Sequence, residues 1–487
     1  MPPIRSHIRF YLNDRLVTLS EVAPDRTLLD FLRLDRVMRG TKEGCAEGDC
    51  GACTVLVGRL DASGLIYESI NACIRLVGSL DGCHVVTVEH LGRTDGTLHP
   101  VQQAMVDYHG SQCGFCTPGF VMSLYGLWLT NPEPSLPEIE KALQGNLCRC
   151  TGYAPIVRAA GAISNYGEAA ADALEVERKT MRDRLQALRD GHRVTVSSPR
   201  GPFIIPADVD DLATIRQEMP DATLIAGSTD VGLWVTKFMR DIAPVIFIQG
   251  LMDEITVDDG VIRIGAGVSY SRSFATIAEH IPQLVPLWDR IGGGQVRNMG
   301  TIGGNIANGS PIGDTPPPLI ALGAELTLRR GSTRRTIRLE DFFIAYGRQD
   351  LVKGEFIESI AVPIPPPDVF FAAYKISKRR DEDITAVLGA FQVHVEGGIV
   401  RDAVIAYGGM AATPKRARAV EAALIGAPWT ITAIEAALPA FEEDFQPLSD
   451  WRASAEYRML VAKNLLSRFF LEMHGEPEVS IQRHEVA

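Results

Sequence analysis

The sequence predicts an α+β protein of several domains. Its 487 residues suggest about three domains on length alone. Stretches with the alternation of strands give way to stretches with helical spacing, then to a region that mixes both. All nine cysteines lie within residues 45–150, eight of them in two groups of four. The chain therefore combines cysteine-bearing N-terminal domains with a larger α+β region.

The composition narrows the class of protein. A formal net charge of −12 argues against a nucleic-acid partner, which needs a basic face. The sequence contains no run of about 18 apolar residues, so we expect no transmembrane helix, and its start has no apolar core of signal-peptide length. Clustered cysteines in a large chain indicate metal binding rather than a disulfide framework. We expect a cytoplasmic protein that does not contact membranes.

Residues 4–90 have the pattern of a small β-rich unit. Residues 8–12 and 15–19 predict a hairpin around Asn13 and Asp14. We expect a helix from Thr27 to Leu34, and strands at 55–57 and 85–88.

Residues 91–165 turn helical. The apolar spacing predicts helices at 101–108, 120–129, 138–143 and 156–163. Residues 166–195 are rich in charge and form either an amphipathic connecting helix or a mobile linker.

The rest of the chain mixes strands and helices. Strand-like runs at 224–225, 245–248 and 261–264 alternate with helical stretches, and the proline-rich segment 363–367 marks a break. The last part has a strand at 403–407 and helices up to His474. The predicted domains are 4–90, 91–165, a linker at 166–195, 196–365 and 366–475.

The first cysteine group has the spacing of a plant-type [2Fe–2S] site. Cys45, Cys50 and Cys53 read C-x4-C-x2-C, and Cys73 follows farther along the chain. Glycines between these cysteines allow the backbone to wrap closely around a cluster. The alternative is structural zinc, which usually takes two close ligand pairs, and Cys73 has no near partner.

The second group reads C-x2-C and then C-x-C, with Cys113, Cys116, Cys148 and Cys150. This spacing also permits zinc. A second iron–sulfur cluster is favoured because the group directly follows a ferredoxin-like unit. The ninth residue, Cys83, is interpreted as a small buried apolar residue.

Three glycine-rich stretches are candidates for binding a pyrophosphate. They are residues 224–230, 292–294 and 301–307, although most glycine-rich turns have no ligand. A fourth stretch, Gly265-Ala266-Gly267, has Tyr270 where a Rossmann fingerprint has its third glycine, so we expect no Rossmann fold. His99 and His109 flank a short helix and are expected at the surface or as caps.

Five motifs carry a resemblance to a known family. They are GCAEGDCGACTV at 44–55, QCGFCTPGF at 112–120, GNLCRCTGY at 145–153, LIAGSTDVG at 224–232 and TIGGNIANGSPIGD at 301–314. With these motifs, residues 4 to 475 resemble the xanthine dehydrogenase family of molybdenum hydroxylases, and specifically its separate small subunit.

The resemblance implies a fold and a set of cofactors. The domains would be a β-grasp ferredoxin-like domain, a helical [2Fe–2S] domain, an FAD domain of the vanillyl-alcohol-oxidase type and a small α/β C-terminal flavoprotein domain. Both cysteine groups would hold [2Fe–2S]. The FAD contacts implied are Leu224, Ile225, Ala226, Gly227, Ser228, Thr229, Asp230, Val231, Gly232, Ile291, Thr301, Gly304, Asn305, Asp314, Ile357 and Lys375. Ile291 stands where relatives often carry an aromatic residue.

The resemblance also implies a function. A molybdopterin cofactor on a partner subunit would oxidise hypoxanthine or xanthine to urate, and Gln112 would face it. Electrons would pass through the Cys150 cluster and the Cys45 cluster to FAD, which would reduce NAD+. No catalytic side chain beyond FAD is expected on this chain. The assembly implied is a heterotetramer with the molybdenum-binding large subunit.

Alternatives remain open at this stage. The partner could act on aldehydes or other N-heterocycles, or the chain could be a passive electron-transfer or scaffold subunit without flavin. The loop 378–383, Lys-Arg-Arg-Asp-Glu-Asp, is a solvated turn by default, but the resemblance places it beside the flavin.

Overall fold

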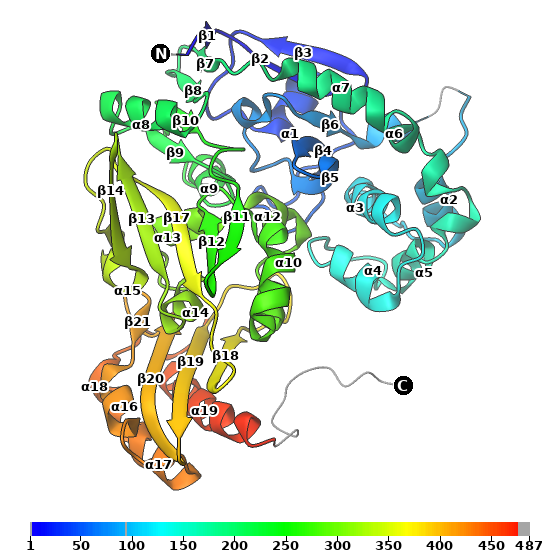
Figure 1. The fold of residues 1–487 in the computed structure, drawn as a ribbon. Helices are drawn as coiled ribbons and strands as arrows, with labels where there is room; N and C mark the ends of the chain where they lie inside the picture. Colours follow the sequence, from blue (N-terminus) through cyan, green and yellow to red (C-terminus); the bar gives the residue numbers. More distant parts are fainter. Residues whose placement is uncertain (1, 93–94, 476–487) are drawn as a thin grey trace. The chain divides into compact units, whose positions relative to one another are not determined.

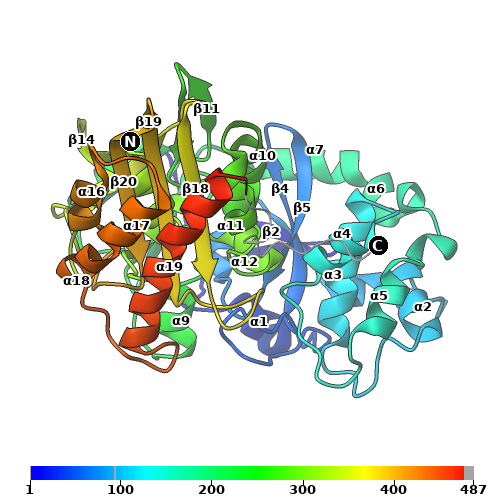
Figure 2. The ribbon, with the colours of Figure 1, turned by 90° about the horizontal axis from the view of Figure 1, so that it is seen from below.

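The computed structural model describes residues 2–92 and 95–475. These residues form two compact units, and Figures 1 and 2 show the ribbon of the chain. The first unit takes the chain up to residue 251, together with 269–271 and 292–301. The second takes 252–268, 272–291 and the residues from 302 onward. No helix within residues 2–92 and 95–475 is both long and apolar enough to cross a membrane.

The first unit opens with a five-stranded mixed sheet in the order β3-β2-β6-β4-β5. Its strands are β2 (Ile8–Leu12), β3 (Arg15–Leu19), β4 (Thr54–Asp61), β5 (Gly64–Asn71) and β6 (His84–Val86). Only the β2–β6 pair is parallel. Helix α1 (Leu28–Asp30) begins after Thr27, whose hydroxyl accepts from the Asp30 N–H at 3.1 Å, and continues as a π-helical turn over Phe31–Asp35. A short helix on such a sheet is the β-grasp arrangement.

Several expectations for this region are confirmed. The hairpin of β2 and β3 has the predicted bounds, and Asn13 in its turn has a φ of 51°. The predicted strand at 85–88 is wrong at its end, because Val88 begins a 3₁₀ turn, Val88–Leu91. Strand β5 was not predicted.

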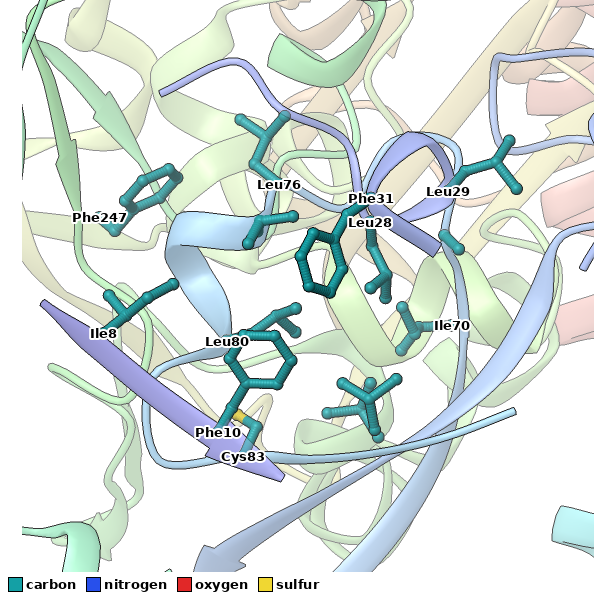
Figure 3. Packing of buried hydrophobic residues seen from close by; sticks show 14 of the residues in the cluster. Ile8, Phe10, Leu28, Leu29, Phe31, Ile70, Leu76, Leu80, Cys83 and Phe247 are labelled. Carbon is teal, nitrogen blue, oxygen red and sulfur yellow. The ribbon is translucent and has the colours of Figure 1, made fainter. Parts of the chain in front are cut away.

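The core of the β-grasp domain extends beyond the domain itself. Phe10 and Phe31 meet edge to face at 5.9 Å, with Leu28, Leu76 and other apolar side chains around them (Figure 3). Phe247, about 170 residues farther along the chain than Leu76, belongs to the same cluster of buried side chains. Burial of aromatic side chains of this size is a large part of what holds such a core together.

The helical domain follows in the same unit. Its helices are α2 (Pro100–Asp107), α3 (Thr117–Thr130), α4 (Leu136–Ala142) and α5 (Ala154–Ala160), close to the predicted ranges. Helix α3 is buried along most of its length, with Phe120, Tyr125 and Trp128 in the core. His99 caps α2 as expected, but it is only 4% exposed, so the expectation of a surface position is wrong.

Residues 166–195 contain helices α6 (Ala173–Val176) and α7 (Arg178–Leu188). The helical alternative is therefore the one that the structure adopts. Met181, Leu185 and Leu188 of α7 are buried against Leu60 and Leu65 of the β-grasp sheet, and the charged face of α7 stays outside.

A second sheet completes the first unit, in the order β1-β7-β8-β10-β9. Its strands are β1 (Ile4–Arg5), β7 (Arg193–Val196), β8 (Phe203–Ile205), β9 (Thr223–Ile225) and β10 (Val245–Phe247). The helices of this region are α8 (Val209–Glu218), α9 (Val231–Thr236) and α12 (Gly294–Met299). Strand β10 runs parallel to both β8 and β9, so β9 and β10 end at the same edge of the sheet.

The second unit begins with an antiparallel sheet in the order β11-β12-β17-β13-β14. Its strands are β11 (Ile255–Asp258), β12 (Val261–Gly265), β13 (Glu325–Arg330), β14 (Thr333–Arg338) and β17 (Phe356–Pro363), beside a small hairpin of β15 (Phe343–Ala345) and β16 (Arg348–Gln349). Strand β12 pairs antiparallel on both sides, which confirms that Gly265-Ala266-Gly267 is not part of a Rossmann fold. The associated helices are α10 (Tyr270–His280), α11 (Val285–Trp288), α13 (Ile302–Asn308), α14 (Pro316–Ala321) and α15 (Leu339–Phe342).

The C-terminal part of this unit is an antiparallel sheet covered by helices (Figure 2). Its strands are β18 (Val369–Ile376), β19 (Val387–Glu396), β20 (Ile399–Gly408) and β21 (Lys415–Arg416), and its helices are α16 (Arg418–Leu424), α17 (Ile431–Ala437), α18 (Phe441–Asp444) and α19 (Ala455–Met473). The predicted strand at 403–407 lies within β20, and the last helix is capped at His474, as expected.

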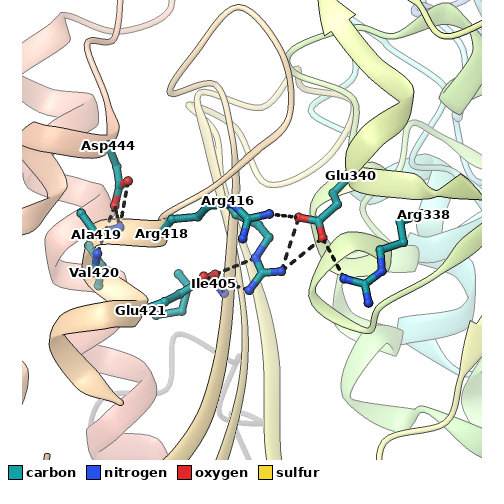
Figure 4. Close-up of polar contacts among 9 residues, drawn as sticks. All are labelled: Arg338, Glu340, Ile405, Arg416, Arg418, Ala419, Val420, Glu421 and Asp444. Atoms are coloured by element: carbon teal, nitrogen blue, oxygen red, sulfur yellow. Dashed lines mark hydrogen bonds and ion pairs between the residues drawn. The ribbon is translucent and has the colours of Figure 1, made fainter. Parts of the chain in front are cut away.

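An ion-pair network joins the two parts of the second unit (Figure 4). Glu340 of α15 pairs with Arg418 at 2.8 Å, Arg416 at 3.3 Å and Arg338 at 3.6 Å. Glu421 pairs with Arg416 from the other side, at 2.9 Å. Because Arg416 is bound by carboxylates from both parts, it ties β21 to the end of β14.

Candidate functional site

The first cysteine group is brought together in the first unit. The Cys45 thiol is within hydrogen-bonding range of the Cys50 and Cys73 thiols, and Cys73 is also in range of Cys53. The backbone N–H groups of Cys50 and Glu47 both donate to Cys45 Sγ at 3.4 Å. The loop thus places four sulfur atoms side by side and directs N–H groups at one of them.

The glycines of this loop are required by close approach. A Cβ on Gly44 would lie 2.7 Å from Cys50 Sγ. Gly51 has a φ of 67°, and a Cβ there would lie 2.0 Å from the Gly145 carbonyl oxygen. A larger residue at either position would displace the sulfur atoms or the neighbouring cysteine loop.

The thiols of this group perturb one another. Hydrogen bonds from the Cys50 and Cys73 thiols hold the pKa of Cys45 far below its ordinary value, despite burial. The pKa of Cys50 and the pKa of Cys73 are raised, first by their hydrogen bonds to Cys45. Thiols this close together cannot all ionise unless a cation lies among them, because their ionisation would otherwise set negative charges side by side.

The second cysteine group is also brought together in the first unit. Its thiols meet as two pairs, Cys113 with Cys150 and Cys116 with Cys148. In the described residues, no three or more His, Cys, Asp or Glu side chains are arranged as ligands of one metal ion. Paired thiols match what a [2Fe–2S] cluster needs, since each of its two irons takes two thiolates.

Cys148 has the most polar surroundings of this group. Its Sγ accepts hydrogen bonds from the Thr151 hydroxyl at 3.1 Å and the Thr151 N–H at 3.5 Å. Burial alone would raise the pKa of Cys148, but these bonds leave it lowered. Burial and the hydrogen bond to Cys148 raise the pKa of Cys116 to about 12. Tyr153 accepts from the Cys148 N–H at 2.9 Å and so fixes the backbone at this ligand.

The second group lies at the surface of the first unit. Cys113 and Cys150 are exposed, and so are Gln112 and Phe115 beside them. The first group is less accessible, because Cys53 and Cys73 are buried. A partner could therefore approach the second group much more closely than the first.

The two cysteine loops touch each other. The Leu147 N–H donates to the Cys50 carbonyl oxygen at 3.0 Å, and the Asn146 side chain donates to the Gly51 carbonyl oxygen at 3.2 Å. Cys50 belongs to the first group, and Leu147 directly precedes Cys148 of the second. One backbone hydrogen bond thus connects the loops.

The predicted flavin contacts fall into two sets. Residues 224–232 and Thr301 lie in the first unit, and the other six lie in the second. In the first set, β9 leads through Ala226 and Gly227 into α9. A Cβ on Gly227 would lie 1.7 Å from the Met299 carbonyl oxygen, so only glycine fits this turn. A loop of small residues between a strand and a helix start suits a pyrophosphate.

This first set rests on the first cysteine group. The Ser228 hydroxyl donates to the Ile74 carbonyl oxygen at 2.9 Å, one residue after Cys73. At the end of α9, the Thr236 hydroxyl donates to the Ala46 carbonyl oxygen at 2.7 Å, and the Lys237 ammonium group donates to the Cys45 carbonyl oxygen at 2.5 Å. The middle of the predicted diphosphate segment and the end of the helix that follows it are therefore bonded to backbone carbonyl groups at or beside cysteines of the first group.

In the second unit, Lys375 and Asp314 form a buried ion pair. The Lys375 ammonium group donates to Asp314 Oδ2 at 2.7 Å and to the Arg290 carbonyl oxygen at 2.9 Å. Arg290 donates in return to the Lys375 carbonyl oxygen at 2.8 Å and to the Arg380 carbonyl oxygen at 3.1 Å. This clamp fixes Ile291, which follows Arg290, and ties it to the charged loop 378–383.

The remaining predicted flavin contacts in the second unit are Gly304, Asn305 and Ile357, and Asn305 is bonded to the residue that follows Asp314. Asn305 Oδ1 accepts from the Thr315 hydroxyl at 2.6 Å, one residue after Asp314. Gly304 is exposed on α13, whereas Ile291 and Ile357 are each 6% exposed. Buried or hydrogen-bonded side chains such as these suit a rigid ligand-binding wall.

The structure also identifies residues that the sequence analysis missed. Gln295 of α12 is 1% exposed and donates to side chains from both cysteine-bearing domains. An isolated glutamine in a glycine-rich stretch gives no periodic signal. Cys83 is buried in the apolar core, as expected, and burial raises its thiol pKa.

Family comparisons agree with this geometry. Four family models match the chain in order: a 2Fe-2S iron-sulfur cluster binding domain at residues 10–76, a [2Fe-2S] binding domain at 87–161, an FAD binding domain in molybdopterin dehydrogenase at 196–365 and a CO dehydrogenase flavoprotein C-terminal domain at 372–473. The chain therefore carries two [2Fe–2S]-binding domains and an FAD-binding domain.

Known relatives are similar along most of this chain. Xanthine dehydrogenase/oxidase of Rattus norvegicus is 31% identical over 95% of the chain and 38% of its own length. Xanthine dehydrogenase of Drosophila pseudoobscura pseudoobscura is 35% identical over 84% of the chain and 35% of its own length. The chain thus spans little more than a third of the curated relatives that it matches.

Solved structures match slightly more than half of this chain. Carbon monoxide dehydrogenase from Hydrogenophaga pseudoflava has a TM-score of 0.53 and 28% identity, over 55% of this chain and 96% of that one. Quinoline 2-oxidoreductase from Pseudomonas putida 86 has a TM-score of 0.50 and 25% identity, over 56% and 96%. The two cluster domains, the FAD-binding domain and the C-terminal domain together show that the chain belongs to the iron–sulfur and FAD-binding subunits of the molybdenum hydroxylase family.

Proposed function

We propose that the chain is the iron–sulfur and FAD subunit of a xanthine dehydrogenase, and that it carries electrons from a molybdenum-binding partner to NAD+. The observation that carries this proposal is the order of contacts in the first unit. The second cysteine group is exposed, its loop is bonded to the first through Leu147 and Cys50, and the first group is bonded to the 224–232 loop through Ile74 and Ser228. This order matches a path that runs from a partner to a flavin.

Each cysteine group would hold one [2Fe–2S] cluster. Cys45, Cys50, Cys53 and Cys73 would bind the first cluster, and Cys113, Cys116, Cys148 and Cys150 the second. The Cys50 and Glu47 N–H groups would stabilise negative charge on Cys45, and Thr151 would do the same for Cys148. Hydrogen bonds to cluster sulfur atoms are among the main determinants of a cluster's potential.

Flavin contacts are proposed in each unit. In the first unit, backbone N–H groups of 224–232 and Thr301 would bind the diphosphate. In the second unit, the proposed flavin contacts are Gly304, Asn305, Asp314, Ile357, Ile291 and Lys375. Lys375 is already oriented by Asp314 and by the Arg290 carbonyl oxygen, so it needs no rearrangement to present its remaining donor. When bound, the clusters supply one-electron exchange and the flavin supplies two-electron hydride transfer to NAD+.

The partner would be a large subunit that binds the molybdopterin cofactor, in a heterotetramer with two copies of each chain. Gln112 and Phe115 are exposed beside Cys113 and would face this partner. The unpaired state of all nine cysteines agrees with a reducing compartment, and we place the complex in the cytoplasm.

A related hydroxylase is the second candidate. The solved structures to which this chain is similar include a carbon monoxide dehydrogenase and a quinoline 2-oxidoreductase, so the partner could act on another N-heterocycle or on an aldehyde. The substrate would be bound by the partner, whose identity therefore decides between these reactions.

The purified complex tests the proposal directly. We expect about four iron atoms per chain, one FAD, molybdenum on the partner, and NAD+ reduction that depends on xanthine. Stoichiometric zinc with about two iron atoms would contradict the assignment of one cysteine group. Activity with quinoline-type heterocycles or aldehydes but not with xanthine would favour the second candidate.

A further inference from the structure

Gln295 lies where the two cysteine-bearing domains meet. It belongs to α12, in the part of the sequence that matches the FAD-binding family, and its side chain is buried between the other two domains. Its Nε2 donates to Thr54 Oγ1 at 3.1 Å in the β-grasp domain. The same atom donates to Ser123 Oγ at 3.2 Å and Asn146 Oδ1 at 3.0 Å in the helical domain.

Each partner of Gln295 is close in sequence to a cysteine. Thr54 follows Cys53, Asn146 precedes Cys148 by two residues, and Ser123 lies on α3, which begins directly after Cys116. These partners also bond to one another. Ser123 donates to Asn146 Oδ1 at 2.7 Å, and Thr54 and Asn146 both donate to the Gly51 carbonyl oxygen.

The network requires an N–H donor at this position. The hydroxyls of Thr54 and Ser123 already donate to Gly51 and Asn146, so both present only acceptor lone pairs to residue 295. The Oε1 atom of Gln295 has no hydrogen-bond partner within residues 2–92 and 95–475 and lies against Gly145, where a Cβ would be 2.1 Å away. An unpaired buried oxygen lowers the free energy of unfolding by about 1–3 kcal/mol. The orientation of the amide thus favours the contacts of its N–H donor over a partner for its oxygen.

The junction that Gln295 supports is the contact between the two cysteine loops. Asn146 precedes Leu147, whose N–H donates to the Cys50 carbonyl oxygen. Without the Gln295 amide, the direct bond from Asn146 to the Gly51 carbonyl oxygen would remain. The hydrogen bonds by which α12 holds both Thr54 and Asn146 would be lost. The neighbouring contacts of α12, Arg297 to Gln144 at 2.8 Å and Asn298 to the Ser69 carbonyl oxygen at 2.8 Å, each reach only one domain.

We propose that Gln295 is a positioning residue for electron transfer between the two clusters, because its buried amide fixes the distance and orientation of the two cysteine loops. This inference rests on the proposed electron path. In that path one electron leaves the reduced cluster of the Cys113 group and enters the oxidised cluster of the Cys45 group. The rate of electron transfer falls with the distance between the two clusters and depends on their orientation, so a displacement of either loop would slow this step.

The variant Gln295→Met tests the proposal, because methionine keeps the length and apolar volume of the side chain but cannot donate. The control is Gln392→Met, a half-buried glutamine of β19 in the second unit. The measurement is low-temperature electron paramagnetic resonance of the protein after reduction with dithionite. The magnetic interaction between the two reduced clusters splits their signals, and the splitting reports the distance and orientation of the clusters. This measurement requires neither NAD+ nor FAD turnover nor the molybdenum partner.

We expect Gln295→Met to retain about four iron atoms, to change or lose the splitting, and to slow electron equilibration between the clusters. Gln392→Met should match the wild type. Ser123→Ala is a milder change in the same network and should give a smaller effect in the same direction. If Gln295→Met does not fold, Ser123→Ala becomes the variant that tests the proposal.

Two results would overturn the proposal. The first would leave the proposed electron path intact, and the second would contradict that path as well. Wild-type splitting and rate in iron-replete Gln295→Met or Ser123→Ala, even with a lower melting temperature, would reduce Gln295 to a stabilising residue and leave the path intact. Absence of two [2Fe–2S] signals from the wild-type protein would remove the proposed path and this inference together.

Discussion

The Ser228 hydroxyl donates a hydrogen bond to the carbonyl oxygen of Ile74 at 2.9 Å. Ser228 lies in the loop predicted to bind the flavin diphosphate, and Ile74 follows the last cysteine of the first group. Ser228 has a φ of 60°, a left-handed conformation that costs a non-glycine residue about 1–2 kcal/mol. Such a conformation persists where the surrounding contacts impose it, which indicates that the cluster loop helps to shape the flavin loop.

The close approach at Gly227 predicts a loss of flavin on substitution. A Cβ in Gly227→Ala would lie 1.7 Å from the Met299 carbonyl oxygen, so the loop must shift. Overpacking of this kind costs about 1–3 kcal/mol, which corresponds to roughly tenfold to hundredfold weaker FAD binding. Flavin content and FAD affinity measure the effect. The control is Gly161→Ala, outside the candidate pyrophosphate stretches, where the nearest atom to an added Cβ lies 3.9 Å away, and equal FAD affinity in both variants would contradict the prediction.

Lys237 should affect the potential of the first cluster. Its ammonium group donates to the Cys45 carbonyl oxygen and pairs with Glu47 at 3.4 Å. Reduction adds negative charge to a cluster, so loss of this cation in Lys237→Met should lower the midpoint potential. Because Lys237 is partly exposed and its charge is screened, we expect a shift on the order of 10–50 mV. A redox titration followed by electron paramagnetic resonance measures it.

The conservative variant Lys237→Arg keeps the charge and serves as the control for this prediction. It should remain close to the wild-type potential. An equal shift in Lys237→Met and Lys237→Arg, or a shift of the second cluster by the same amount, would show that the effect is structural and not electrostatic.

The Thr151 hydroxyl should raise the potential of the second cluster. It donates to Cys148 Sγ at 3.1 Å, and such a bond stabilises the more negative, reduced state. Thr151→Val removes the hydroxyl while keeping the shape, and should lower the midpoint potential of the second cluster by on the order of 20–60 mV. Thr151→Ser retains the donor and should restore the potential. A second-cluster potential in Thr151→Val that equals the wild type would refute this role.

Asp172 should make the helical domain sensitive to acid. It accepts hydrogen bonds from Tyr125 at 2.6 Å and His99 at 2.8 Å. Burial alone would raise the pKa of Asp172, but these bonds outweigh it and leave the pKa lowered. A carboxyl group whose pKa is lower in the folded state stabilises the fold above its unfolded pKa, and that contribution is lost as the pH falls through the folded pKa. The loss should begin at about pH 5.

The variant Asp172→Asn checks this account of acid sensitivity. We expect it to lower the free energy of unfolding by about 2–4 kcal/mol at pH 7, because buried donors lose a charged acceptor. Denaturant unfolding, measured between pH 4 and pH 7, should depend less on pH than in the wild type. Asp258→Asn, at the exposed end of β11, is the control and should keep the wild-type slope. A slope that is unchanged in Asp172→Asn would assign the acid sensitivity to other groups.

Features that depend on residues close together in the sequence were predicted correctly. The Asn13-Asp14 turn and the Thr27 cap are local, so their hairpin and helix have the expected positions. Cysteine spacing likewise identified two groups whose thiols do meet, although in the second group the contacts join the two motifs, Cys116 with Cys148 and Cys113 with Cys150.

Features that depend on distant partners were missed. Strand β5, Gly64–Asn71, carries half-buried Tyr67, Glu68 and Ser69 in place of an apolar alternation, and its stability comes from pairing with β4. Strand β1 pairs with β7 almost two hundred residues later, a contact with no local signal. His99 caps its helix, which was one of the two predicted roles, but its burial was not predicted because its acceptor, Asp172, lies seventy-three residues away.

The central claim is that electrons enter at the exposed second cysteine group and reach the flavin through the first. Cys150→Ser, studied in the complex as isolated, tests it most directly. The account predicts that xanthine-dependent NAD+ reduction falls to background, while dye reduction driven by NADH at FAD stays close to wild type. Equal loss of both activities, with FAD and the first cluster intact, would contradict the proposed order.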